Sequence, residues 1–375
     1  MGDIRNGIIL NMPRKRNVVE EGVLTALKSD VELKCGFPIR SSKDCTQLSK
    51  LIFTATKHHI SVNTLRRFFS LEKSRFSVSH STMEILGKYV SNIMVPEAVL
   101  DFEVAFVIDF FRPHHFESID YNDKSFQASC RKIAVLINGN VSLFQRVMDF
   151  LGTNKMGQKF YFDLFPDYDI LPLFQYKGYE IYWENTQDRN DRLYVASLLT
   201  RAFYFRGEHD KVLLWKSRAM SLYDSNSPDF HSFTLGRFFF AVLVSSQGSD
   251  YQKWVSEAKT IEQTIARDAK DYFNDFPGFH YLICDAFYLK SDYTSLLYFA
   301  QKALTDFKEY AEFSWKGYYD QLRIFRAVAL FHLDNDSEVR KEIMQIDTSK
   351  FYFISRNYFH AIHQRLMNEV NERVR

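Results

Sequence analysis

With 375 residues, the chain is long enough for two or three domains, or for one small domain followed by an extended array. Its 46% hydrophobic and 25% charged residues are ordinary for a folded protein and argue against a disordered chain. The 36 Phe and 21 Tyr stand beside only 14 Gly and 8 Pro, which leaves little room for the tight turns of a sandwich or barrel. We therefore expect an all-α fold in which aromatic side chains fill the gaps between helices.

The net charge of +2 hides an uneven distribution of charge along the chain. Residues 1–92 contain 15 Lys and Arg against 8 Asp and Glu, a net charge of +7, whereas residues 93–375 contain 33 against 38, a net charge of −5. Modules that bind phosphate groups carry such a basic excess, although solvated surface lysines produce the same imbalance. The sequence thus divides into a basic head, residues 1–92, and an acidic body.

Cysteine usage and hydropathy indicate the cellular compartment in which the protein is expected. The four cysteines are scattered without paired spacing, which argues against both a zinc site and a disulfide framework. The N-terminal basic cluster follows a short apolar stretch, the reverse of the order in a secretory signal. No run of 18 uncharged apolar residues predicts a membrane helix. We therefore expect a cytoplasmic protein that does not bind a membrane.

The first predicted helices lie in the head. Residues 42–56 present apolar side chains on one helical face, and a short polar break follows them. Ser61 is then placed to cap a second helix over 61–71, and a third helix is predicted over 81–90. The second helix is expected to bury an apolar stripe made of Val62, Leu65, Phe68 and Phe69.

The polar side of this second helix suggests contact with DNA. A helix, a short turn and a second helix with exposed Asn, Thr and Arg is the layout of a helix-turn-helix reader, in which loop lysines hold phosphates. The run over about 45–92 also resembles a helix-turn-helix-like N-terminal segment of Bacteroidetes proteins. A plain helical hairpin with a solvated basic face remains the alternative. The residues expected to contact nucleic acid are Lys57, Asn63, Thr64, Arg66, Arg67, Lys73 and Arg75.

Residues 93–189 predict a helical connecting region without a clear repeat. Pro96 and the acidic residues that follow it favour a helix start, because proline and negative charge suit a first helical turn. The polar stretch 112–124 is the best candidate boundary within this region.

Histidines give no convincing metal site. His114 and His115 lie near Asp109, and His360 and His363 share the last predicted helix, but neither pair has a third ligand at a suitable spacing. We therefore expect no metal and no cofactor.

Residues 190–346 repeat with a period of 42. Four acidic residues keep this spacing, and a compact residue stands six positions before each of them. Compact side chains before a turn let two helices approach closely, and a single hairpin cannot bury its apolar face alone. The sequence thus predicts four stacked helical hairpins. The acids expected in the turns are Glu208, Asp250, Asp292 and Asp334, and the compact residues expected to be buried are Ala202, Val244, Ala286 and Val328.

Two of these units resemble tetratricopeptide repeats. Residues 202–222 and 286–307 match the middle and second helix of that family, with Gly207 at the place of its turn glycine. The period of 42 and the serines Ser249 and Ser291 in place of Gly207 depart from the family pattern. The resemblance implies an α-solenoid that binds a peptide or protein segment in its groove. Residues 347–375 then predict a C-terminal capping helix.

Three functions fit these features. The first is a regulator whose head binds double-stranded DNA and whose solenoid senses a peptide or protein, an architecture shared with peptide-sensing regulators of Gram-positive bacteria. The second is an interaction scaffold or adaptor whose basic head docks an acidic protein. The third, an enzyme, has the least support, because phosphate-binding loops, dinucleotide motifs and nucleophile elbows are missing from the sequence. We favour the regulator, and the sequence leaves open whether it forms a homodimer.

Overall fold

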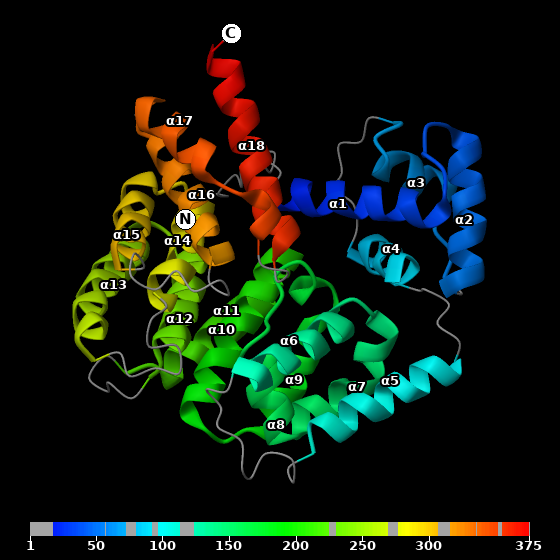
Figure 1. Ribbon diagram of the computed structural model, residues 1–375, viewed down its shortest axis with the longest axis horizontal. Coiled ribbons are helices and arrows are strands. Elements are labelled where there is room, and N and C mark those ends of the chain that lie inside the picture. Colours follow the sequence, from blue (N-terminus) through cyan, green and yellow to red (C-terminus); the bar gives the residue numbers. More distant parts are fainter. Residues whose placement is uncertain are drawn as a thin grey trace, which may run out of the picture.

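The computed structural model describes residues 18–56, 58–72, 80–91, 97–112, 124–224, 230–268, 277–306, 316–334, 336–351 and 355–374. These residues form α-helices with short π-helical and 3-10 segments and no strand, which confirms the predicted all-α fold (Figure 1). None of the described helices is both long and apolar enough to cross a membrane.

The head contains four helices around a core of its own. These helices are α1 (Val18–Cys35), α2 (Ser42–Thr56), α3 (Val62–Phe68) and α4 (His80–Ser91). Each contributes a fully buried side chain to the centre, and these are Val31, Leu48, Leu65 and Leu86. The predicted ends of the head, residues 1 and 92, lie outside the described residues.

The connecting region is helical as well, and it contains two π-helical turns. Its elements are α5 (Glu97–Phe110), α6 (Lys124–Asn138), α7 (Val141–Thr153), α8 (Lys155–Gly157), η2 (Gln158–Phe162), η3 (Leu171–Gln175) and α9 (Tyr176–Asn185). The π-helical turns η2 and η3 flank the segment 163–170. Such turns are rare and often occur at functional positions, so this segment is a candidate for more than connection. Most of the predicted boundary 112–124 lies outside the described residues.

The C-terminal half consists of helical hairpins. Their helices are α10 (Arg189–Arg206) and α11 (His209–Leu222), α12 (Ser232–Ser245) and α13 (Gly248–Asp268), α14 (Gly278–Lys290) and α15 (Tyr293–Asp306), and α16 (Lys316–His332) and α17 (Asp336–Gln345). The first helices α10, α12, α14 and α16, called here the first-helix row, pack against one another in chain order (Figure 1).

The positions singled out by the repeat lie close to where the sequence placed them. Glu208, Asp292 and Asp334 lie between the helices of their hairpins, whereas Asp250 lies in the first turn of α13. The four compact residues six positions earlier are all buried, as predicted. That the array is a solenoid with a regular period of 42 residues remains a prediction.

Two of the hairpins turn in the same way. Gly207 and Ser291, 84 residues apart, both adopt the left-handed conformation directly after the first helix, with φ of 69° and 56°. The following residues donate their backbone N–H groups to Phe203 O at 3.1 Å and to Phe287 O at 3.0 Å. These bonds satisfy carbonyl groups that a helix end leaves free. The first and third hairpins therefore share a turn that the second, with extended Ser246, does not.

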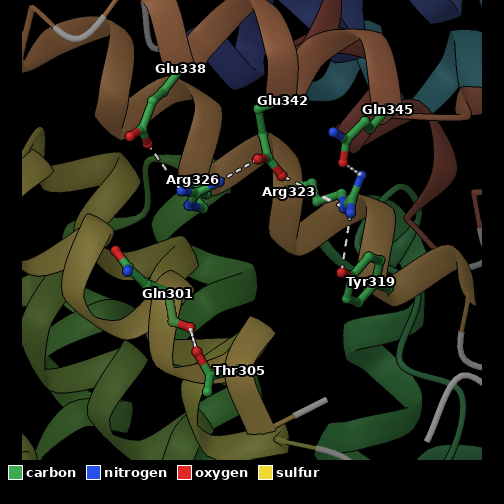
Figure 2. A network of polar contacts seen from close by, with 8 residues as sticks. All are labelled: Gln301, Thr305, Tyr319, Arg323, Arg326, Glu338, Glu342 and Gln345. Carbon is green, nitrogen blue, oxygen red and sulfur yellow. Dashed lines mark hydrogen bonds and ion pairs between the residues drawn. The ribbon is translucent and has the colours of Figure 1, made fainter. Parts of the chain in front are cut away.

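Ion pairs join the two helices of the last hairpin (Figure 2). Arg326 of α16 pairs with Glu342 of α17 and, at 3.2 Å, with Glu338. Arg323 donates to Gln345 Oε1 at 2.6 Å (Figure 2). These contacts fix α17 against α16 where few apolar side chains are available, since Val339 is the one described residue of α17 in the hydrophobic core.

A buried carboxylate ties the second hairpin to the third. Glu262 of α13 accepts from Lys302 Nζ at 2.6 Å and lies 3.2 Å from His280 Nε2. Tyr298 O–H donates to its other oxygen at 3.3 Å. The hydrogen bond with His280, followed by that with Lys302, lowers the pKa of Glu262 to about 2.

The last helix, α18 (Arg356–Val374), follows the short 3-10 turn η5 (Thr348–Lys350). It contacts α16, and on another side it lies against α1 of the head (Figure 1). The helix therefore does more than cap the array, because it also joins the body to the head.

Replacing Ser291 with glycine should stabilise the protein. The left-handed conformation costs a residue with a side chain roughly 1–2 kcal/mol, and glycine avoids this cost. Part of the resulting gain in stability is lost, because glycine is more flexible in the unfolded chain. We expect a gain of about 0.5–1 kcal/mol in urea unfolding. Gly207→Ser, the reverse change at the equivalent turn, should lower stability by a similar amount. Equal midpoints for all three proteins would contradict the shared turn.

The stability contributed by Glu262 should disappear in acid. Because its folded pKa of about 2 lies below the ordinary value of 4.5, the contribution is complete above pH 4.5 and is lost as the pH falls towards 2. Urea unfolding at pH 6 and pH 3 should show a larger loss of stability for the wild type than for Glu262→Gln. Parallel losses in both proteins would show that Glu262 contributes nothing to the acid sensitivity.

Candidate functional site

The helix expected to read DNA is shorter than predicted. Ser61 caps α3 as expected, because its Oγ accepts the Thr64 N–H at 3.1 Å. The helix ends at Phe68 rather than at residue 71, since Ser70 adopts a φ of 61° and the Leu71 N–H returns to Arg66 O at 2.8 Å. This is the hydrogen-bond pattern of a left-handed helix stop. About two turns of helix therefore carry the predicted site.

The two faces of α3 differ as the sequence predicted. Leu65 and Phe68 are buried in the head core, and Val62 and Phe69 pack partly against it. Asn63 and Arg67 are exposed on the opposite side, whereas Thr64 and Arg66 are half-buried. The turn before α3 is fixed because Ser49 Oγ donates to Ile60 O at 2.6 Å. Lys57, Lys73 and Arg75 lie outside the described residues.

The adjacent arginines of α3 are not equivalent. Arg66 Nη1 lies 3.4 Å from Asn63 Oδ1 and 3.7 Å from Glu72 Oε2, so its charge is partly compensated within the head. Within the described part of the chain, no carboxylate forms an ion pair with Arg67. Arg67 is therefore the more available of the two for an external phosphate or base.

A second site lies inside the body, where α10 and α14 of the first-helix row are covered on every side. Residues 193–203 of α10 and 278–287 of α14 are buried without interruption. Since a helix turns every 3.6 residues, burial over such a stretch means that all its faces are covered. The helices α9 and η3 lie against α10, where Arg206 at the end of α10 donates to Pro172 O at 2.9 Å, and α18 lies against α16. This face of the first-helix row is thus filled by the chain itself.

A buried arginine stands at the centre of this face. The Arg201 guanidinium of α10 forms an ion pair with Asp285 of α14, and both side chains are almost completely inaccessible. Its central carbon lies 3.6 Å from the centre of the Tyr168 ring and 4.4 Å from that of Phe240. The second oxygen of Asp285 accepts the hydroxyl of Tyr358 from α18. Five separate segments therefore meet at one carboxylate and one cation, namely α10, α12, α14, α18 and the segment 163–170.

A second buried cation lies on the other side of Tyr168. Arg237 of α12 donates to the Tyr168 hydroxyl at 2.9 Å and lies 5.0 Å from the centre of the Tyr194 ring. Its Nε is buried and has no hydrogen-bond partner in the structure. The rings of Tyr168 and Tyr194 thus take over part of the role that a carboxylate has at Arg201. We call Tyr168, Arg201, Arg237, Asp285 and Tyr358 the buried junction.

Two aspartates of the segment 163–170 hold the start of α18. Asp167 accepts the Ser355 N–H at 3.1 Å, and Asp169 accepts the N–H groups of Asn357 and Tyr358 at 3.0 and 2.9 Å. These are the amides that the first turn of a helix leaves without partners. Burial raises the pKa of Asp167 to about 6 and that of Asp169 to about 8.

Sequence reasoning missed the buried junction, although one signal was present. Arg201 and Asp285 stand directly before Ala202 and Ala286, two repeats apart in the predicted register. Opposite charges at an equivalent, otherwise apolar position indicate a pair inside the array. Tyr358 offered no such signal, because it belongs to the tail outside the repeat.

The candidate metal ligands do not converge. In the described ranges no three His, Cys, Asp or Glu side chains form a group that could hold a metal ion. His360 receives a contact of 3.4 Å from Arg356 Nε, and burial lowers the pKa of both His360 and His363. His114 and His115 lie outside the described residues.

Comparisons with protein-family models, with curated proteins and with solved structures give no match. Two sites of the described chain are therefore candidates for function, the polar face of α3 and the buried junction.

Breaking the buried ion pair should be costly. Asp285→Asn leaves Arg201 buried without a counter-charge, and we expect a loss of about 3–5 kcal/mol in urea unfolding. The double variant Arg201→Met/Asp285→Leu removes both charges and should recover most of that loss. A single variant within about 0.5 kcal/mol of the wild type would mean that water reaches Arg201.

Proposed function

We propose that the protein is a DNA-binding regulator whose head contacts double-stranded DNA and whose tetratricopeptide-like body senses a peptide or protein segment in the cytoplasm. The observation that carries this proposal is that α3 has one buried apolar face and one exposed polar face. Its buried Leu65 and Phe68 turn Asn63 and Arg67 outward, and Ser61 fixes the start of the helix. Arginine and asparagine are the side chains that bind guanine and adenine edges in the major groove.

The charge distribution supports the same proposal. The net charge of +7 over residues 1–92 favours approach to a polyanion, and the net charge of −5 over the rest disfavours binding by the body. The contact between α1 and α18 gives the body a physical connection to the head. A regulator needs such a connection, since a signal received by the body has to change what the head does. A homodimer, common among such readers, remains part of this proposal.

The second candidate is a scaffold that binds an acidic protein through the head. The observation in its favour is apolar exposure on the head, where Leu33 of α1 is 83% exposed and Phe53 of α2 is 51% exposed. DNA contacts are mainly polar and charged, whereas protein interfaces use apolar side chains of this kind. The short α3 and the pairing of Arg66 with Glu72 also fit a scaffold.

Fluorescence anisotropy with a labelled duplex across a salt series separates the two candidates. Arg66→Ala/Arg67→Ala should weaken binding by about 1–3 kcal/mol, roughly 5- to 150-fold, without changing the unfolding midpoint. Glu72→Gln should strengthen binding, because it removes a negative charge beside Arg66 and frees that side chain.

Arg340→Ala is the matched control, since Arg340 is an exposed arginine on α17 of the body. It should bind DNA as the wild type does. If the wild type fails to bind even at low salt, the regulator is excluded and the scaffold is favoured. If the double variant binds as tightly as the wild type, the contact lies elsewhere on the head.

A further inference from the structure

The face of the first-helix row that a peptide would use already has an occupant. The start of α18 inserts adjacent aromatic side chains, Tyr358 and Phe359, which are 2% and 1% exposed. The Phe359 ring centre lies 6.1 Å from that of Tyr281 on α14 and 5.4 Å from that of Phe325 on α16. An amphipathic helix laid against apolar partner helices is a general mode of peptide recognition.

Helix α18 joins the hydrophobic core of the body through one face only. One stripe of the helix is buried, made of Tyr358, Phe359, Ile362 and Leu366, while residues between them remain accessible. Specific polar contacts gather at its first turn, where Asp167 and Asp169 accept backbone N–H groups and Asp285 accepts the Tyr358 hydroxyl. The helix is thus held by a few polar contacts at its first turn and by one apolar stripe. Another helix with the same pattern could make the same contacts.

Removal of α18 would leave polar groups that need a new partner. Asp285 would lose the Tyr358 hydroxyl, and the carboxyl groups of Asp167 and Asp169 would lose the amides they cap. Arg201 would lose the Tyr358 ring, whose centre lies 5.4 Å from the guanidinium carbon. Uncovered charged groups favour replacement of α18 by a similar helix over a lasting open state.

We propose that the first-helix row and the segment 163–170 form a binding site for a helical protein segment with adjacent Tyr and Phe in its first turn. In this structure α18 occupies that site, and a partner segment of the same pattern displaces it. Because α18 also lies against α1, displacement removes one of the contacts that hold the head to the body. The inference rests on the proposed function in that it identifies the segment sensed by the body.

A synthetic peptide tests the site directly. A fluorescein-labelled peptide of residues 355–374 is titrated with the full-length protein and followed by anisotropy. The full-length variant Tyr358→Ala/Phe359→Ala keeps the site and weakens its own occupant, so it should bind the peptide at least tenfold more tightly than the wild type. A peptide carrying the same two alanines should lose binding to both proteins, and Asp285→Asn in the full-length variant should weaken binding of the wild-type peptide.

Equal binding of the wild-type peptide by the two proteins, or no binding by either, overturns the proposal. If circular dichroism shows that the double variant is unfolded, Tyr358→Phe takes its place. This change removes only the hydroxyl bonded to Asp285, and the affinity for the peptide should still rise, by about threefold. An unchanged affinity there counts against the site.

The peptide assay contains no DNA, so the two proposals fail separately. A protein that binds the peptide but no duplex contradicts the regulator and leaves the helix-binding site in place. If the protein binds a duplex but the Tyr358→Ala/Phe359→Ala variant binds the peptide no more tightly than the wild type, the regulator proposal stands and the helix-binding site is contradicted.

Discussion

A guanidinium group that is cut off from water needs a counter-charge and partners for its N–H groups, or its burial costs several kcal/mol. Arg201 finds a counter-charge and aromatic rings only where distant parts of the chain come together, and its Nη2 has no hydrogen-bond partner in the structure. Asp285 supplies the carboxylate from α14, and Tyr358 of α18 holds the other oxygen of that carboxylate. The ion pair therefore holds the hairpins together, and the last helix adds a contact to the same carboxylate. The head depends on the same arrangement, because α1 lies against α18.

This constraint changes how the array presents a binding surface. An array of helical hairpins commonly offers an open concave face, on which peptides bind. Here that face is closed by the chain's own aromatic rings, and Asp285 and Asp169 beneath them accept hydrogen bonds from α18. Under the proposal, a ligand for the body competes with α18 instead of entering an empty groove. The internal contact would lower the apparent affinity for that ligand, and its binding would change the surroundings of α1.

Local patterns made the hairpins and turns predictable, whereas contacts between distant segments were not. Ala202 and Ala286 were expected to be buried because a compact residue, Ala or Val, recurs before each turn, and they are. The two faces of α3 followed from the spacing of Leu65 and Phe68, but its early end at Phe68 depends on a left-handed backbone conformation of Ser70 that serine does not signal. Tyr358 and Asp285 are 73 residues apart, and nothing near either in the sequence indicates the other.

Native-state hydrogen exchange of the full-length wild-type protein tests most directly whether α18 is a separable occupant of the body. Amides of α18 should open with a clearly lower free energy than the amides of α10 and α14, because the hairpins keep their own contacts when α18 leaves. Protection in α1 should fall together with that in α18. If α18, α10 and α14 all exchange with one common free energy, that of global unfolding, then α18 is an inseparable part of the core and the account is wrong.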